Sequence, residues 1–264
     1  NTTKIELKEN WRFHLGECEE AWYKGYDDSG WRTVTVPHDW SVEAPFSRAY
    51  SSGTGYLQGG IGWYRVRFRL PEIYRGKRIR LCFDGVYKNS QVFCNSYYLG
   101  KRPNGYVSFS YDISAQALFG EEENEISVKV VHNDLADSRW FTGSGITRKV
   151  TLLIEEPVHP AQYGCVFRTD SISGEDSGAA AKEKDVSGTE KVSGTQAASA
   201  QISVVHEPVN DSKAPVSLKI RTILLDGQQH IAAEFTGTTE LAAGEQGRIN
   251  QSGSMDTPSL WSPE

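Results

Sequence analysis

His38 and Asp39 are neighbouring residues of the two types that assist the nucleophile in a Ser-His-Asp triad. Such a triad also needs a serine on a sharp strand-to-helix turn between glycines, or an equivalent exposed nucleophile. No serine in that arrangement accompanies the pair. We therefore do not expect these residues to carry out nucleophilic hydrolysis.

The cysteines offer a second kind of chemistry, metal binding or disulfide formation. They show neither C-x-x-C spacing nor companion histidines, so we expect no metal and no cofactor. Cys82 and Cys94 could form a disulfide if their strands were neighbours, but strand cysteines are more often small buried hydrophobes. Free thiols indicate a reducing compartment and predict a cytoplasmic protein; secretion or a periplasmic location after loss of a signal peptide is the alternative. The four are Cys18, Cys82, Cys94 and Cys165.

Three arginines, Arg65, Arg67 and Arg69, alternate with apolar and aromatic residues. A basic stripe can bind phosphate groups, but the formal net charge of −6 argues against nucleic acid as a partner. The alternation instead predicts the solvated face of one strand. No apolar run approaches the roughly 20 residues of a spanning helix, so we expect no membrane partner.

Tryptophan and tyrosine are dense in the first part of the chain. A sugar-binding platform is one interpretation, and buried anchors that hold irregular loops on a β-sandwich are the other. The burial tendency of large aromatic residues favours anchors. The residues are Trp11, Trp22, Tyr23, Tyr26, Trp31 and Trp40.

The elements that must position these residues are β-strands. Residues 79–83 place Ile79, Leu81 and Phe83 on one face, and residues 91–95 alternate in the same way. The turn signal Asp84-Gly85 makes them two consecutive core strands joined by a short connection. Similar stretches with almost no helical periodicity predict an all-β fold that begins with a jelly-roll β-sandwich over residues 1–155.

Residues 156–264 are predicted to form a second domain, which starts at the boundary signal Glu155-Glu156-Pro157. Strand patterns resume at residue 201, and Asp226-Gly227 is typical of a hairpin turn. The pattern predicts an immunoglobulin-like β-sandwich without the Cys-Trp-Cys set of antibody domains. Residues 171–200, rich in Ser, Gly, Ala, Lys and Glu, are predicted to be a flexible insertion because they bury too little apolar surface to offset ordering entropy.

Four motifs follow one another in an order typical of a known family. Together they resemble the N-terminal sugar-binding domain of glycoside hydrolase family 2, and the last motif resembles the β-galactosidase branch more than the β-glucuronidase branch. The second predicted domain is similar to the immunoglobulin-like domain that follows in that family. The motifs are Val36-Pro37-His38-Asp39-Trp40, the stretch from Gly59 to Arg65, the set Phe83-Asp84-Gly85-Val86 with Val92-Phe93-Cys94-Asn95 and Leu99-Gly100, and the stretch from Ser138 to Ile146.

The resemblance implies that this chain carries no catalytic residue. Members of the family hold a nucleophile and an acid/base carboxylate on a (β/α)8 barrel, and no alternating β-α pattern exists here. Asn124-Glu125 matches the dipeptide around the family's acid/base, but it opens an alternating strand and is interpreted as a chance match. The parent protein is expected to be an enzyme, and this chain alone is expected to be inactive.

The resemblance also implies a set of sugar contacts. In the family, the loops that correspond to residues 37–40 and 133–140 lie at the mouth of the barrel. The candidate substrate-binding residues are Asp39, Asn133 and Arg139 for hydrogen bonds to hydroxyl groups, and Trp140 as a stacking face. The alternative for each is a hydrogen bond or salt link that only fixes a loop.

The predicted function is that of the non-catalytic N-terminal part of a β-galactosidase that hydrolyses terminal β-D-galactosides with retention. The first expected partner is a β-galactoside sugar, which this part alone should bind weakly. The other expected partners are the missing barrel domain and another copy of the protein in a homo-oligomer. A self-sufficient carbohydrate-binding module and a structural oligomer-interface domain are the alternatives.

Overall fold

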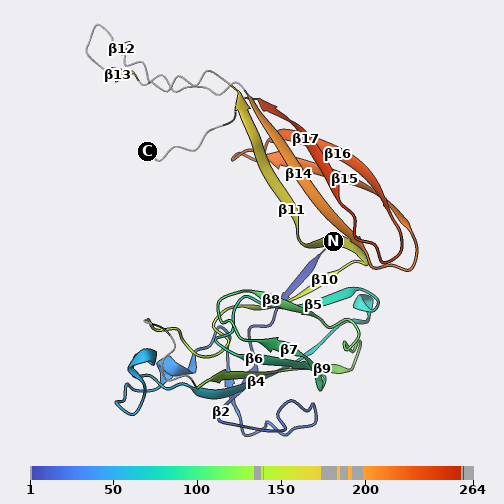
Figure 1. Ribbon diagram of the computed structural model, residues 1–264. Helices are drawn as coiled ribbons and strands as arrows, with labels where there is room; N and C mark the ends of the chain where they lie inside the picture. Colours follow the sequence, from blue (N-terminus) through green and yellow to red (C-terminus); the bar gives the residue numbers. More distant parts are fainter. Residues whose placement is uncertain are drawn as a thin grey trace. The chain divides into compact units, whose positions relative to one another are not determined.

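The computed structural model of the protein describes residues 2–133, 138, 140–173, 183–184, 190–191, 199–256 and 258. The chain divides into two compact units, Asn1–Glu156 and Pro157–Glu264 (Figure 1). Both units consist of strands, so the predicted all-β class of two successive sandwiches is confirmed. No helix among these residues is long and apolar enough to cross a membrane.

The first unit contains a four-stranded and a six-stranded sheet, and three short 3-10 helices lie in its loops. In the first sheet the order is β1 (Thr3–Glu6), β10 (Val150–Glu155), β5 (Arg78–Phe83) and β8 (Phe109–Asp112). In the second it is β3 (Arg32–Val34), β2 (Trp11–Leu15), β4 (Gly60–Arg69), β9 (Glu123–His132), β6 (Ser90–Cys94) and β7 (Tyr97–Arg102). The 3-10 helices are η1 (Trp40–Glu43), η2 (Ser52–Thr54) and η3 (Glu72–Tyr74).

One core fills the space between these two sheets. Leu81 of β5 is completely buried and lies opposite the buried Leu152 of β10. On the other sheet, Tyr64 of β4 lies opposite Val128 of β9, and both are completely buried. Residues two apart along a strand share a face, so the period-two apolar pattern indicated this core correctly.

The two strands predicted around Asp84-Gly85 are present, but they belong to different sheets. β5 lies between β10 and β8, whereas β6 lies between β9 and β7. Residues 84–89 therefore lead from one sheet to the other instead of closing a hairpin. Alternation identifies a half-buried strand, but it does not specify the strand with which that segment pairs.

This topology also corrects the idea that Cys82 and Cys94 might lie on adjacent strands. Cys82 is on β5 and Cys94 is on β6, and all four cysteines are free. Burial raises the pKa of the Cys94 thiol to about 12. Cys94 is therefore a neutral, packed side chain and not a reactive thiol.

The second unit has a three-stranded sheet covered on one face by a two-stranded one. The hairpin turn predicted at Asp226 is confirmed by the 2.9 Å hydrogen bond that the Asp226 backbone N–H donates to the carbonyl oxygen of His230. Its buried apolar cluster is small and consists of Ala200, Ile202, Val204 and Phe235. The larger sheet has the order β11 (Val158–Ser173), β14 (Ser199–Asn210) and β17 (Ile249–Asp256), and the smaller one pairs β15 (Val216–Leu225) with β16 (Ile231–Leu241).

Strand pairing extends into both ends of the predicted insertion, residues 171–200. β11 continues to Ser173, which lies opposite Ser199 at the start of β14. Residues 171–173 are exposed and two of the three are serines, so apolar periodicity could not reveal this end of β11. Within the segment, β12 (Glu183–Lys184) pairs with β13 (Glu190–Lys191). The prediction for residues 174–182, 185–189 and 192–198 lies outside the described residues.

Candidate functional site

Two loops of the first unit meet where the predicted sugar-contacting residues lie. Residues 37–41 follow β3 and enter η1, and residues 143–147 precede β10. The backbone N–H of His38 donates to the Ile146 carbonyl oxygen at 2.8 Å, and that of Trp40 donates to Ser144 at 3.1 Å. Each loop therefore fixes the backbone of the other, although about a hundred residues separate them in the sequence.

Asp39 joins these loops through its carboxylate. Its Oδ1 atom accepts hydrogen bonds from the backbone N–H groups of Ser41 and Ser144, each 2.9 Å long. Burial raises the pKa of Asp39 even though both donors favour the ionised form. The bond to Ser41 caps η1, as expected for an aspartate at a helix N-terminus. Asp39 therefore holds the two loops together. Its contact with a sugar stays a prediction.

Position 145 must be glycine because the two loops approach each other closely there. Its φ angle is +128°, and a Cβ atom built there would lie 2.6 Å from the His38 carbonyl oxygen and would collide with the Tyr64 hydroxyl. A larger residue would therefore push the two loops apart. Close packing accounts for the glycine within the motif Gly143-Ser144-Gly145-Ile146.

His38 belongs to a chain of hydrogen bonds that ends at a carboxylate. The Tyr64 hydroxyl lies 2.7 Å from Nδ1 of His38. Nε2 of His38 lies 3.1 Å from Oε1 of Glu43 and 3.2 Å from Nη2 of Arg32. Burial, which outweighs the attraction of Glu43, holds the pKa of His38 below its ordinary value. His38 and Asp39 therefore face different partners and do not form part of one triad.

A serine and a histidine do meet in this region, but they are buried. Nδ1 of His132 lies 2.7 Å from the Ser144 hydroxyl, which lies 2.6 Å from the hydroxyl of Ser41. Ser41 in turn is 2.7 Å from the carbonyl oxygen of Gln58. Ser144 is completely buried, so no substrate can reach it and the cluster ties three loops together. Sequence reasoning missed this cluster because its members come from distant segments without a shared pattern.

The other predicted contacts lie closer to solvent. Asn133 is exposed at the end of β9, and Trp140 has 63% of its surface exposed. Nε1 of Trp140 donates to the Tyr106 hydroxyl at 3.1 Å, which orients the indole ring without covering it. Arg139 lies outside the described residues. An exposed, oriented indole and an exposed amide are each chemically suited to a sugar, which offers an apolar ring face and hydroxyl groups.

Asn133 also lines a shallow depression beside η2. Its volume is about 310 Å³, and its wall is formed largely by backbone, small residues, hydroxyl groups and amides. Such a surface can exchange hydrogen bonds with a neutral polar ligand. The residues are Ala49, Tyr50, Ser51, Thr54, Leu57, Gln58, Gly59, Gly60, His132 and Asn133.

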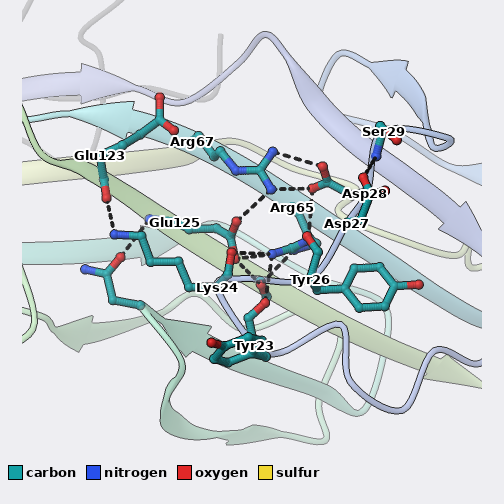
Figure 2. A network of polar contacts seen from close by, with 12 residues as sticks. Tyr23, Lys24, Tyr26, Asp27, Asp28, Ser29, Arg65, Arg67, Glu123 and Glu125 are labelled. Carbon is teal, nitrogen blue, oxygen red and sulfur yellow. Dashed lines mark hydrogen bonds and ion pairs between the residues drawn. The ribbon is translucent and has the colours of Figure 1, made fainter.

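A second polar cluster lies on the outer face of the six-stranded sheet (Figure 2). Nη1 and Nη2 of Arg67 donate to the two carboxylate oxygens of Asp28, each at 2.9 Å. Arg65 lies 3.1 Å from the same carboxylate and also pairs with Glu125 of β9. Nη2 of Arg67 lies 2.9 Å from the other oxygen of Glu125. Two cations and two anions are therefore packed together with little solvent.

The same cluster fastens a loop. Arg65 donates to the carbonyl oxygens of Tyr26 at 2.8 Å and Tyr23 at 3.0 Å, so the loop lies over the sheet (Figure 2). The expectation that Arg65, Arg67 and Arg69 form a solvated face is therefore wrong for Arg65, which is completely buried. Strand alternation shows which side chains share a face, but not what covers that face.

This cluster also decides the role of Asn124-Glu125. Glu125 is buried and held by two guanidinium groups, so it has no access to a substrate and cannot donate its proton to one. Asn124 is buried as well and binds the backbone of Leu118. Both residues serve the packing of β9, which agrees with the interpretation of the dipeptide as a chance match.

The predicted aromatic anchors divide into two groups. Trp11, Trp31 and Trp40 are buried, as expected for anchors, whereas Trp22 and Tyr23 are exposed. Nε1 of Trp40 donates to the Gly59 carbonyl oxygen at 3.2 Å and ties η1 to the start of β4. No group of three or more His, Cys, Asp or Glu side chains suited to a metal ion occurs among the described residues.

Comparison with known proteins identifies relatives over the whole chain. The sugar binding domain of glycosyl hydrolases family 2 matches residues 5–157, more than half of the sequence. The β-galactosidase BoGH2A of Bacteroides ovatus is 35% identical over 98% of this chain and 28% of its own length. A putative β-glucuronidase of Formosa agariphila is 38% identical over 64% of this chain and 16% of its own length.

A solved structure extends the similarity to both units. The β-glycosidase of Bacteroides vulgatus superimposes with a TM-score of 0.80 at 33% identity and covers 99% of this chain and 30% of that protein. The chain thus spans about three-tenths of the length of such relatives.

Proposed function

Because this chain belongs to glycoside hydrolase family 2, we propose that it is the non-catalytic N-terminal part of a β-galactosidase, and that the whole protein hydrolyses terminal β-D-galactosides. The observation that carries this proposal is the similarity to the Bacteroides ovatus β-galactosidase, which runs through both units and not only through the sugar-binding domain. The whole enzyme would act with retention through two carboxylates outside this chain.

The proposed role of the first unit is to complete the sugar subsite. Asp39 and Ser144 hold the two loops together from within, and Asn133 and Trp140 lie at the surface next to them. Fixed loops matter here because a displacement of about 1 Å in a positioning group can cost roughly 100-fold in rate. Arg139 belongs to the same proposal by its place in the sequence.

A β-glucuronidase is the second candidate for the whole protein. It is favoured by the 38% identity to the putative β-glucuronidase of Formosa agariphila within the first unit. Activity on two substrates separates the candidates. The full-length protein should have a kcat/KM for a nitrophenyl β-galactoside at least 10-fold above that for the corresponding β-glucuronide. A preference for the glucuronide would overturn the proposal.

A further inference from the structure

A second cavity of the first unit adjoins the depression beside Asn133. Gln58 lines both of them, so the two hollows are neighbours on the surface. The second cavity is formed where β2 ends, where β3 begins and where η1 lies, and its wall includes Trp31, Arg32 and Glu43. Its volume of about 390 Å³ lies within the range of small-molecule sites. We name it the Trp31 cavity.

Aromatic side chains give the Trp31 cavity a rigid apolar floor. Phe13, Trp31 and Trp40 are all buried, so the surrounding structure holds them in place. The rings of Phe13 and Trp40 stack with their centroids 5.8 Å apart, and the His14 ring stacks on Trp31 at 5.4 Å. Leu15, which is 37% exposed, extends this apolar surface toward solvent. An apolar floor of this kind suits the apolar face of a pyranose ring.

Arg32 and Glu43 add a polar wall without net charge. Both Nη atoms of Arg32 donate to the Glu43 carboxylate, one to each oxygen. The guanidinium group also lies over the Phe13 ring, with its Cζ atom 4.8 Å from the ring centroid. The planar groups are therefore fixed, and both side chains are still partly exposed. Among the residues that line the cavity, these two are the only lysine, arginine, aspartate or glutamate, so the lining favours a neutral ligand.

Two further side chains offer polar atoms that the protein itself does not use. Within the described part of the chain, neither the ring nitrogens of His14 nor the side-chain amide of Gln58 forms a hydrogen bond. Both residues are half-buried and oriented, because His14 stacks on Trp31 and the Gln58 carbonyl oxygen accepts a 2.7 Å hydrogen bond from Ser41. An imidazole and an amide each both donate and accept, which matches the hydroxyl groups of a sugar.

We infer that the Trp31 cavity binds a pyranose unit of a neutral oligosaccharide, at a distance from the galactose that is removed. The cavity adjoins the depression beside Asn133, so one oligosaccharide can reach from the proposed subsite into it. The substrate class of the whole protein is then an oligosaccharide with a terminal β-galactose, not a small galactoside. The inference rests on the proposed function for the reaction, but the binding by the cavity does not depend on it.

NMR titration of the 264-residue chain with β-1,4-galactotetraose tests the binding. This neutral oligosaccharide should shift the ring signals of His14 and Trp31 with a Kd of about 1–10 mM, because the chain holds only part of the ligand. Tetragalacturonic acid, a pyranose chain with a carboxylate on every unit, should shift these signals at least 5-fold less at equal concentration. Unshifted His14 and Trp31 signals would overturn the inference. Equal shifts with the acidic probe would also overturn it.

Two glycines provide a matched pair of variants. Gly30 lines the cavity, and a Cβ atom built there meets no atom within 4 Å, so a tyrosine can take up space that the ligand needs. Gly227, in a turn of the second unit, is equally open. Gly30→Tyr should raise the Kd for galactotetraose at least 5-fold, whereas Gly227→Tyr should leave it unchanged. Both should keep Tm within about 2 °C of the wild type. If Gly30→Tyr does not fold, His14→Ala takes its place and should raise the Kd at least 3-fold; a wild-type Kd would contradict the inference.

Kinetics of the full-length protein provide a second readout. Gly30→Tyr should lower kcat/KM for galactotetraose at least 5-fold, mainly through KM, and should leave kcat/KM for a nitrophenyl β-galactoside unchanged, because that substrate is too short to reach the cavity. Equal losses on both substrates, or no loss on either, would overturn the inference. If the wild-type protein hydrolyses neither substrate, the proposed function is wrong, and the titration still decides whether the cavity binds the oligosaccharide.

Discussion

Arg65 holds the carboxylates of Asp28 and Glu125 beneath a loop that covers β4 and β9. Removing a charged side chain from such a buried cluster destabilises the fold more than removing one from the surface, because the remaining charges stay buried and incompletely paired. Asp39 and His38 illustrate a related principle at the other polar region. Their polar atoms form hydrogen bonds with backbone N–H groups, with Tyr64 and with Glu43. These bonds hold loops in place, so the atoms are not available for catalysis.

We predict that Arg65→Met destabilises the first unit by about 3–5 kcal/mol, since the buried carboxylates lose their main partner. The Tm should fall by roughly 10 °C. Tryptophan fluorescence is a suitable probe because all tryptophans except Trp261 precede residue 157. The control is Arg69→Met, whose side chain is 60% exposed and whose loss should shift Tm by less than about 2 °C. Equal shifts would mean that the cluster contributes little to stability.

His38 should make the stability of the first unit sensitive to acid. Burial lowers its pKa in the folded state, so the unfolded chain binds the proton more readily. Its contribution is therefore complete above the unfolded pKa of about 6.5 and is lost as pH falls through the folded pKa. The wild-type Tm should drop between pH 7.5 and 5, and the drop should be smaller in His38→Gln. Identical profiles for the wild type and His38→Gln would contradict the prediction.

At the scale of elements, loops of the first unit are held rigidly by distant segments, whereas their tips remain exposed. The segment after β9 combines both features, because His132 is tied to Ser144 while Asn133 and Trp140 are exposed. Substitutions of the exposed loop residues should therefore affect ligand binding more than folding. Substitutions of the residues whose hydrogen bonds hold the loops should affect folding more than ligand binding.

Trp140→Ala should lower kcat/KM of the full-length enzyme by about 2- to 13-fold, which corresponds to about 0.5–1.5 kcal/mol of lost ring contact. Its Tm should change little because the indole ring is largely exposed. Tyr163→Ala, an exposed aromatic of the second unit, should leave both quantities unchanged. A lower Tm with unchanged kcat/KM would show that Trp140 acts only in the fold.

The connection between β11 and β14 should be dispensable for folding. Residues 174–198 contain almost no large apolar side chains, and Ser173 lies opposite Ser199, so a short Gly-Ser turn can join the strands. Shortening the loop should lower its closure entropy cost by about 1–2 kcal/mol. The Tm of the deletion variant should stay level or rise, and protease should cut the intact chain first near residues 182–191. Failure of the variant to fold would mean that the segment contributes to a core.

At the scale of the whole molecule, the two β-sandwich units together span about three-tenths of the length of relatives such as the Bacteroides ovatus protein. Among the described residues, the buried apolar cluster of the first unit is extensive, whereas that of the second unit is small. A site that is shared with absent parts of the protein offers only some of its hydrogen bonds and leaves most of the ligand in water. This chain by itself should therefore be a poor binder and no catalyst.

We predict that galactose and lactose bind the 264-residue chain with a Kd of about 1 mM or weaker, equivalent to no more than about 4 kcal/mol. Titration calorimetry measures this directly. Micromolar affinity would favour a self-sufficient carbohydrate-binding module. The same preparation should not hydrolyse a nitrophenyl galactoside, and turnover that survives repurification would contradict the non-catalytic role.

The sequence alone indicated most of the strands, the core face of the first unit and the family. Period-two alternation in segments such as 79–83 reflects burial on one face, and that relation is local. The position of Ser144, the covered Arg65 and the separation of β5 from β6 were decided only by the tertiary structure. Each depends on segments that lie far apart in the sequence, and local patterns carry no information about which segment covers or pairs with which.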